Sequence, residues 1–385
     1  MRIRSIAVHN FKSLVGFEFE LAKLTCLIGL NGAGKSTVLQ FVDFLSQLVR
    51  GDMQGWLDQR QWQPGDVRSK LLKKKNVEFR VALQSDGGEP IGSWEGHYNP
   101  TENRCTWEQL AILDKKLEVQ GGEVAIFRCE DGEKIWYSPL SFDYEGSILS
   151  SLKEKTLTTG MVECKRLFSG AESLDMLTPD RLRQRTREAK GSLGHGGRNL
   201  SAFVFELGLE GRNALAATLK KAYPRLKGVN AKSLRSGWKQ LYATEVFDGQ
   251  RFSTEARHLN DGMLRLIAIL AELNSDHGLL LFDEIENGIN PELVEFVMNT
   301  LLEAKQQVLV TTHSPMILNY LDDITAAKSV VYLYKTPAGY TRAIPFFQIP
   351  SLQAKLEVMG PGEAFVDTNL NELDEEIANI LQEKP

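Results

Sequence analysis

The chain contains a complete phosphate-binding motif close to its N-terminus. Residues Gly29-Leu-Asn-Gly-Ala-Gly-Lys-Ser36 match the pattern G-x-x-x-x-G-K-[ST] in full. An apolar stretch over 24–28 precedes the motif, and apolar residues at helical spacing follow it over 38–48. A strand, a glycine-rich loop and a helix are the context that this motif requires, so the feature constrains the chain to a P-loop α/β fold.

The residue types in this loop suit a nucleotide phosphate. The glycines allow backbone N–H groups to approach phosphate oxygens, and the helix N-terminus adds a partial positive charge. Lys35 is expected to reach the outer phosphates of ATP, and the Ser36 hydroxyl is expected to hold Mg²⁺. The residues predicted to contact the nucleotide here are Asn31, Gly32, Ala33, Gly34, Lys35, Ser36 and Thr37.

Composition narrows the class of protein. The 385 residues are 42% apolar and 25% charged, which is ordinary for a globular protein with more than one lobe. No apolar run approaches the ~18 residues of a membrane helix, so no membrane association is expected. Four scattered cysteines favour a reduced, cytoplasmic protein and argue against a zinc site.

The order of expected elements predicts an α/β head with a second, antiparallel part. Alternating stretches separated by turn residues over 77–145 predict an antiparallel β segment. Strands and helices alternate over 255–335, which favours a mostly parallel sheet. We expect four parts: the N-terminal part of the ATPase lobe, an inserted helical and basic lobe, the C-terminal part of the ATPase lobe, and an acidic C-terminal tail, over residues 1–145, 146–250, 251–340 and 341–385.

Two acidic residues follow an apolar strand in the second half of the chain. Leu279-Leu-Leu-Phe-Asp283-Glu284 reads as a buried strand that ends in carboxylates. Asp283 is expected to join the Mg²⁺ shell. Glu284 is expected on the opposite side of the pleat, where it would polarise the attacking water.

Two further segments complete the set of motifs. Val308-Leu-Val-Thr-Thr-His313 predicts a strand that ends in a histidine able to contact a γ-phosphate and water. His258-Leu-Asn-Asp-Gly-Met-Leu-Arg265 predicts the start of a helix, capped by Asn260 or Asp261 and offering free N–H groups to an anion.

Together these motifs resemble the ABC-type ATPase heads of the SMC, RecF and OLD class. More narrowly, the chain is similar to stand-alone bacterial OLD-like "AAA family ATPase" proteins that lack a Toprim nuclease domain. The opening IAVHNFKSL resembles the first strand of that family and implies that Lys12 lies near the nucleotide. The residues Glu286 to Pro291 resemble the D-loop, His313 the switch histidine, and Gln63 and Gln84 are the candidates for the Q-loop.

The resemblance also assigns the segment after His258 to the signature motif. Asn260, Asp261, Gly262 and Met263 would then contact ATP held by another head, with Asn260 where serine is usual. This implies a homodimer with ATP sandwiched between heads, and it leaves a higher oligomer open. Transporter ATPases are disfavoured because 227 residues separate Lys35 from Gly262, and chromosome-organising proteins because no sustained heptads occur.

Charge is unevenly distributed along the chain. Between Arg181 and Thr244 the net charge is +11, although the whole chain carries −5. Such a segment favours nucleic acid, but an acidic protein surface and an unpartnered solvated face stay open. We therefore expect an ATPase that acts on DNA or controls an effector, in anti-phage defence or DNA repair. The alternative is an ATP-gated scaffold that holds a separate nuclease or toxin without binding DNA itself.

Overall fold

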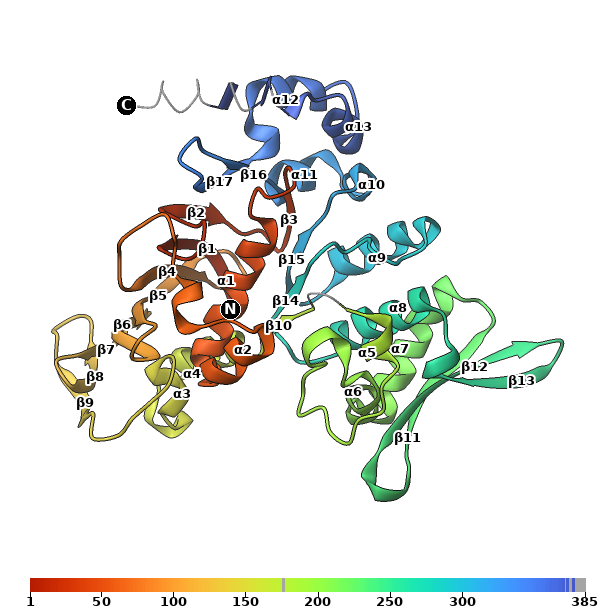
Figure 1. The fold of residues 1–385 in the computed structure, drawn as a ribbon, viewed down its shortest axis with the longest axis horizontal. Helices are drawn as coiled ribbons and strands as arrows, with labels where there is room; N and C mark the ends of the chain where they lie inside the picture. The colour runs from red at the N-terminus through yellow and green to blue at the C-terminus, as the bar shows by residue number, and fades with distance from the viewer. Residues whose placement is uncertain (175–176, 371, 374–375, 378–385) are drawn as a thin grey trace. The chain divides into compact units, whose positions relative to one another are not determined.

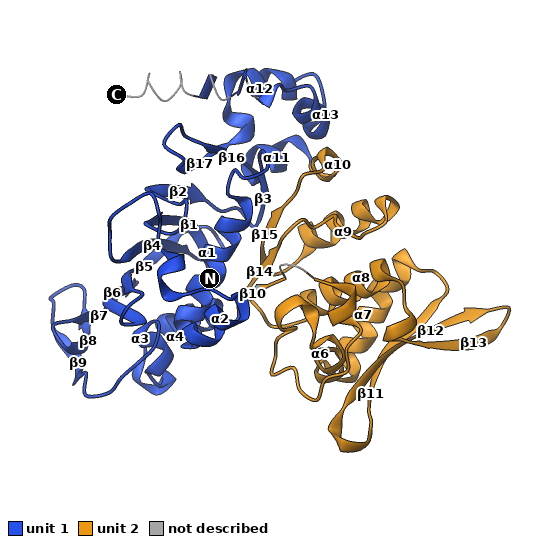
Figure 2. Cartoon of the chain, in the orientation of Figure 1, with its two compact units in different colours: residues 1–171, 322–385 blue, residues 172–321 orange. Residues whose placement is uncertain are grey.

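The computed structural model describes residues 1–174, 177–370, 372–373 and 376–377. The chain divides into two compact units, coloured separately in Figure 2. Unit 1 comprises residues 1–171 and 322–385, and unit 2 comprises residues 172–321.

Unit 1 contains a large antiparallel sheet, in which eight described strands follow the order β2-β1-β4-β5-β6-β7-β8-β9 (Figure 1). Buried and more exposed residues alternate along β4 and most of its neighbours, because one face of such a sheet packs on the core. The antiparallel segment expected over 77–145 is confirmed. The strands are β1 (Arg2–His9), β2 (Phe17–Glu20), β4 (Val77–Gln84), β5 (Pro90–Asn99), β6 (Arg104–Ile112), β7 (Lys115–Gln120), β8 (Glu123–Arg128) and β9 (Lys134–Pro139).

A second group of strands in unit 1 carries the phosphate-binding loop. Strand β3 (Leu24–Ile28) is wholly buried and pairs in parallel with β16 (Val330–Lys335), which pairs antiparallel with β17 (Thr341–Pro345). Helix α1 (Lys35–Arg50) follows the loop and is buried along most of its length. The remaining helices of unit 1 are α2 (Met53–Arg60), α3 (Ile148–Ser151), α4 (Thr159–Ser169), α11 (Asp323–Ser329), α12 (Pro350–Leu356) and α13 (Pro361–Val366), with the 3₁₀ turns η1 (Pro64–Val67), η2 (Glu154–Thr156) and η6 (Phe346–Gln348).

The segment expected as an acidic tail begins as ordered structure. Strand β17 forms because Thr341 to Pro345 pairs with β16 across the turn at Gly339, and helices α12 and α13 follow. The prediction of a plain tail from 341 was therefore wrong for its first part. Part of the acidic stretch beyond 370 lies outside the described residues.

Unit 2 contains short parallel strands and a helical layer. Strand β10 (Glu172–Ser173) pairs with β14 (Leu279–Phe282), and β14 pairs with β15 (Gln307–Thr311), both in parallel. Helices α8 (Asp261–Leu273) and α9 (Pro291–Glu303) lead into β14 and β15. The other helices are α5 (Pro179–Leu182), α6 (Leu200–Glu206), α7 (Gly208–Ala222) and α10 (Pro315–Leu318), with the 3₁₀ turns η3 (His195–Gly197), η4 (Arg235–Gly237) and η5 (Ala256–His258).

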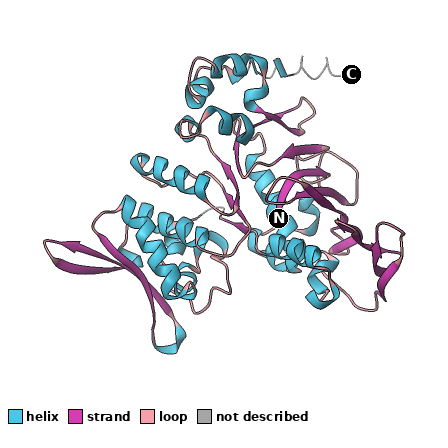
Figure 3. Ribbon diagram, turned by 180° about the vertical axis from the view of Figure 1, so that it is seen from behind, coloured by secondary structure: helices cyan, strands magenta, loops and turns pink. Residues whose placement is uncertain are grey.

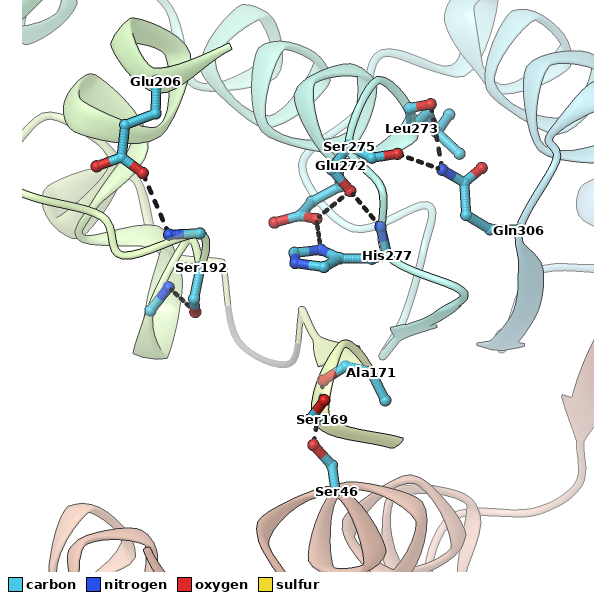
Figure 4. Close-up of polar contacts among 12 residues, drawn as sticks. Ser46, Ser169, Ala171, Ser192, Glu206, Glu272, Leu273, Ser275, His277 and Gln306 are labelled. Atoms are coloured by element: carbon cyan, nitrogen blue, oxygen red, sulfur yellow. Dashed lines mark hydrogen bonds and ion pairs between the residues drawn. The ribbon is translucent and has the colours of Figure 1, made fainter. Parts of the chain in front are cut away.

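The connection between α8 and β14 is fixed by buried polar contacts (Figure 4). The Glu272 carboxyl, which is fully buried, has its Oε2 2.7 Å from Nδ1 of His277. The Gln306 amide donates to the carbonyl oxygens of Leu273 and Ser275, at 3.3 and 3.2 Å. These contacts replace the hydrogen bonds lost at the helix end, so β14 starts from a defined position.

The inserted lobe is not wholly helical, which corrects the expectation for 146–250. Residues 226–255 form an antiparallel sheet of β11 (Leu226–Ser233), β12 (Lys239–Phe247) and β13 (Gln250–Glu255), shown in magenta in Figure 3. In the sequence, the Asp248-Gly249 pair between two alternating stretches is typical of a β-hairpin. Both residues have positive φ, at 47° and 79°, and they connect Phe247 directly to its partner Gln250 as a two-residue hairpin turn.

A buried carboxyl in unit 1 makes stability depend on pH. Glu108 accepts hydrogen bonds from Nε1 of Trp94, Oγ of Ser147 and the backbone N–H of Ile148. Burial nevertheless raises the pKa of Glu108 above its ordinary value of 4.5.

We predict that this carboxyl contributes less to the free energy of unfolding as pH rises from 4.5. In that range the folded chain keeps a proton on Glu108 that the unfolded chain releases. The free energy of unfolding therefore falls by up to about 1.4 kcal/mol per pH unit. Denaturant titrations of wild type and Glu108→Gln across this range should give an unfolding free-energy difference that changes with pH. The exposed Glu130→Gln is the matched control, and a constant difference for Glu108→Gln would contradict the prediction.

Candidate functional site

The phosphate-binding loop of unit 1 has a conformation that its sequence requires. Gly29 has φ 142°, and a Cβ there would lie 2.2 Å from the carbonyl oxygen of Leu333 on β16, so a side chain is excluded. The Lys35 ammonium donates to the carbonyl oxygens of Gly29 and Leu30, at 2.8 and 3.2 Å. These bonds hold the lysine head group at the loop.

Thr341 on β17 is distant in sequence from the phosphate-binding loop but hydrogen-bonds to it. Its hydroxyl donates to the carbonyl oxygen of Ala33 at 2.9 Å and lies 2.8 Å from the hydroxyl of Ser13. The Lys335 ammonium donates to the Thr341 hydroxyl oxygen at 3.0 Å. Thr341 is fully buried. Sequence reasoning missed it, since only the pairing of β16 with β17 brings it to the loop.

The loop side of α1 is open to an anion. Asn31, Gly32 and Ser36 are exposed, whereas Ala33 and Lys35 are buried. The first turn of α1 contains no acidic residue, and no side chain caps it. A 16-residue helix with such an N-terminus offers free N–H groups and a positive dipole end to a phosphate group.

Lys12 borders a pocket of about 470 Å³ in unit 1. Its ammonium donates to Oε1 of Gln40 on α1 at 2.9 Å and lies 3.2 Å from the ring centroid of Trp62. Burial, reinforced by Arg60, lowers the pKa of Lys12 to about 8, while Asp66 opposes the shift. The pocket is lined by Lys12, Ser13, Trp62, Asp66, Arg68, Lys70 and Leu71.

Trp62 is held in this pocket by a polar and aromatic chain that starts on α1. The buried Asp43 accepts hydrogen bonds from Nε1 of Trp56 and from Nη2 of Arg60, both at 2.6 Å. The Trp56 ring packs edge-on against Trp62 with 5.3 Å between centroids. Trp62, whose role the sequence did not reveal, therefore lines the pocket beside Lys12, and the buried Trp56 supports its ring from behind.

In unit 2 the ends of β14 and β15 are joined by one hydroxyl. Oγ1 of the buried Thr311 donates to Oδ1 of Asp283 at 2.5 Å and accepts the N–H of Glu284 at 2.8 Å. Strand β14 ends at Phe282, and Glu284 has φ 47°. The direction of the Glu284 side chain is therefore set by this turn, not by the strand pleat that the sequence analysis invoked.

Arg265 of α8 supports this turn from within unit 2. Its Nη2 donates to the carbonyl oxygen of Glu284 at 3.1 Å. Burial lowers the pKa of Arg265, and the carboxylates of Glu286, Glu284 and Asp283 act in the other direction. The sequence placed Arg265 at the end of the signature segment, but it gave no sign of this contact.

His313 lies beside Glu284, as the order of the strands suggested. Its Nε2 is 3.9 Å from Oε1 of Glu284, and its backbone N–H donates to Oε1 of Glu286 at 2.9 Å. Both Glu284 and His313 are exposed, so a water or a phosphate oxygen can reach them.

The signature segment starts α8 in unit 2. Asn260 is the N-cap, and its Oδ1 accepts the N–H of Met263 at 2.8 Å. Asp261 forms an ion pair with Arg183, and a Cβ added at Gly262 would lie 3.3 Å from the carbonyl oxygen of Gly288. The Met263 side chain is buried in the core, so its contact with a nucleotide stays a prediction.

The donors assigned to Mg²⁺ are chemically suited to that ion. Mg²⁺ in nucleotide sites binds one or two protein oxygens together with phosphates and water. The exposed Ser36 hydroxyl and the Asp283 carboxylate are such donors. Among the residues that the structure describes, no group of three or more His, Cys, Asp or Glu side chains forms a separate metal site.

The basic segment after Pro179 is helical only at its start, because α5 ends at Leu182. Arg183 pairs with Asp261, and Arg185 pairs with Glu255. The arginines act here as internal partners, because the carboxylates that meet them come from elements distant in sequence.

Comparison with known proteins supports an ATPase. Residues 1–91 match the family model described as "AAA ATPase domain", and residues 172–319 match "AAA domain, putative AbiEii toxin, Type IV TA system". The chain is also 32% identical over 88 residues to the cytochrome c biogenesis ATP-binding export protein CcmA of Alcanivorax borkumensis. That match covers 20% of this chain and 39% of the relative. Among the described residues, no helix is long and apolar enough to cross a membrane.

Solved structures decide the fold. An SMC head bound to the C-terminal winged-helix domain of ScpA aligns with a TM-score of 0.55 and 12% identity, over 89% of this chain and 97% of that one. The fold is that of an SMC-type ATPase head. An SMC head from Pyrococcus furiosus with an extended coiled coil, bound to the C-terminal domain of ScpA, gives 0.52 and 11%, over 92% and 99%. The predicted fold class is confirmed, whereas the narrower OLD-like assignment stays a prediction.

We predict that affinity for ATP falls about tenfold between pH 7 and pH 9. Lys12 loses its proton as pH passes its pKa of about 8, and the neutral amine attracts phosphate less. Calorimetric titration with a non-hydrolysable ATP analogue at these pH values measures the change. Lys12→Arg keeps the charge throughout and should remove most of the pH dependence. An unchanged pH dependence in that variant would contradict a contact between Lys12 and the nucleotide.

Proposed function

We propose that the chain hydrolyses ATP to ADP and phosphate as a homodimer that acts on nucleic acid. The observation that carries the proposal is the cluster at the ends of β14 and β15. There Thr311 fixes Asp283 and Glu284, and His313 lies next to the Glu284 carboxylate. A complete P-loop in the same chain supplies the phosphate-binding half of such a site.

In this proposal each side chain has one task. The N–H groups from Asn31 to Thr37 and the Lys35 ammonium bind the phosphates. Ser36 and Asp283 hold Mg²⁺, which neutralises charge on the phosphate oxygens. Glu284 orients the attacking water and accepts its proton, and His313 contacts the γ-phosphate.

The exposed start of α8 supports the proposed dimer. Asn260, Asp261 and Gly262 would contact ATP held by a second copy, in line with the family resemblance. The N–H groups at a helix start favour an anionic ligand, and ATP would then hold two chains together until hydrolysis. This cycle of ATP-dependent association and dissociation would drive conformational changes in a bound nucleic acid or partner protein.

Nucleic acid is the partner that the charge distribution favours. Several cations within the +11 segment are exposed even though Arg183 and Arg185 are paired internally. Backbone phosphates bind such cations with an affinity that falls as salt rises. DNA repair and anti-phage defence are the settings in which we place this activity, with the chain in the cytoplasm.

A second candidate function is a scaffold for a separate effector protein. It is favoured by three exposed apolar side chains of unit 1: Ile324, Val358 and Val366. The aligned SMC heads were solved with a domain of ScpA bound, so this fold accommodates partner proteins. In this alternative, the ATP-bound dimer would hold a nuclease or toxin and release it after hydrolysis.

We predict that Glu284→Gln lowers kcat for ATP hydrolysis by about 10²–10⁴-fold while ATP still binds. The amide keeps the shape of the side chain but cannot accept the proton of water. Phosphate release measures the rate, and light scattering with ATP should show a persistent dimer. Normal turnover in this variant would remove Glu284 from the mechanism.

The Lys35→Ala variant tests the assignment of the phosphate-binding loop. It should lose affinity for ATP itself, because the phosphates lose a charge-assisted hydrogen bond. Circular dichroism would establish that the variant is folded. Unaltered affinity would contradict the assignment of Lys35 to the phosphates.

A further inference from the structure

The antiparallel sheet of unit 2 carries a surface that the ATPase chemistry does not use. We call residues 226–255, which form β11, β12 and β13, the ribbon. Val229, Leu241 and Ala243 of the ribbon are buried, and α6 and α7 contact β12 and β11. Figures 1 and 3 show the turn between β12 and β13 extending beyond these helices. Aromatic residues that are not buried lie at both ends of β12, Trp238 just before its first residue and Phe247 as its last.

Trp238, at the start of β12, forms a pocket with arginines. Its side chain is 41% exposed, although tryptophan is the largest apolar residue. The pocket has a volume of about 460 Å³ and is lined by Trp238, Leu234, Arg185 and Arg235. The Arg187 guanidinium lies 5.2 Å from the Trp238 ring centroid. Arg185 is paired with Glu255, so the groups left for a ligand are the Trp238 ring and the guanidinium groups of Arg187 and Arg235.

The Trp238 backbone is fixed on both sides. The N–H of Leu234 donates to the carbonyl oxygen of Trp238 at 2.7 Å, which closes the turn through η4. The N–H of Lys239 donates to the carbonyl oxygen of Thr186 at 2.7 Å, which ties β12 to the segment that carries Arg185 and Arg187. The backbone on both sides of the Trp238 ring is therefore fixed before any ligand binds, which limits the entropy cost of binding.

The other end of β12 also has exposed aromatic rings beside an arginine. Phe247 and Phe252 are 39% and 49% exposed, and their ring centroids are 5.8 Å apart. The Arg225 guanidinium lies 5.0 Å from the Phe247 ring. An exposed aromatic side chain beside an arginine thus occurs at both turns of the ribbon.

Aromatic rings beside guanidinium groups suit single-stranded nucleic acid. An unpaired base stacks on a ring, and the adjacent phosphates pair with arginine. Duplex DNA keeps its bases inside the helix, so it would use the cations and leave the rings without a role. An apolar protein partner would use the rings and leave the arginines unpaired. We propose that the ribbon binds single-stranded nucleic acid, with one base stacked on Trp238 and phosphates on Arg187 and Arg235. This inference rests on the proposed function, because it names the form of nucleic acid that the ATPase acts on.

The test is binding of fluorescent ~20-nucleotide oligodeoxyuridine, oligouridine and duplex DNA by the full chain, followed by anisotropy at two salt concentrations. We expect the two single strands to bind more tightly than the duplex. Trp238→Ala should weaken single-strand binding about tenfold, whereas Trp238→Phe should keep most of it because phenylalanine still stacks. Arg235→Ala should weaken binding and reduce the salt dependence by about one phosphate contact. Oligodeoxyuridine and oligouridine differ only in the sugar, so a difference between them would tell DNA from RNA as the preferred strand.

The matched control is Tyr137→Ala in unit 1. Tyr137 is 63% exposed with the Lys134 ammonium 5.3 Å from its ring, so it has a similar ring and cation outside the ribbon. This control should bind like wild type. Binding that persists unchanged in Trp238→Ala and Arg235→Ala, or a preference for duplex, would overturn the inference but not the proposed function. A wild-type chain with no affinity for any of the three ligands would overturn the nucleic-acid part of both.

Discussion

The hydroxyl of Thr311 is the contact on which the candidate chemistry of unit 2 depends. It bonds both the Asp283 carboxylate and the N–H of Glu284, so one side chain at the end of β15 fixes two acidic residues at the end of β14. Parallel pairing of β14 with β15 makes this possible, because it brings the carboxyl ends of the strands together. Arg265 then holds the left-handed turn at Glu284 through its carbonyl oxygen. Without these bonds the two carboxylates would belong to a solvated turn.

Unit 1 uses a second buried threonine in a comparable way. Thr341 on β17 holds the carbonyl oxygen of Ala33, while Ser13 and Lys335 surround the same hydroxyl. In both units a fully buried threonine on a strand fixes a segment that must stay exposed to work. A buried hydroxyl can do this because it donates and accepts at once and adds no charge to the interior. The exposed loops can thus be ordered without being covered.

The sequence predicted the parts of the site that are local. The P-loop, the acidic end of β14 and His313 each lie within a short stretch whose residue types and spacing carry the chemistry. Thr341, Arg265 and Trp62 could not be predicted, because their roles come from contacts between segments distant in the chain. The ribbon was missed for another reason. Its strands follow helices and carry many polar residues, so only the turn at Asp248 marked them as strands.

Net charge was a weaker guide than the contacts of individual arginines. The arginines after Pro179 contributed to the basic segment, yet two of them neutralise Asp261 and Glu255 within unit 2. The arginines beside Trp238 and Phe247 are instead placed next to exposed rings. Cations that lie next to exposed rings therefore favour nucleic-acid recognition more strongly than the summed charge of a segment does.

In the proposed dimer, α8 of one chain completes the ATP site of a second chain. The specific ATPase activity of the purified wild-type chain, measured over a wide range of protein concentrations at saturating ATP, tests this arrangement. We expect activity per chain to rise with concentration and then level off, as the ATP-bound dimer becomes the main species. Activity per chain that stays constant down to concentrations at which light scattering shows only monomer would contradict it.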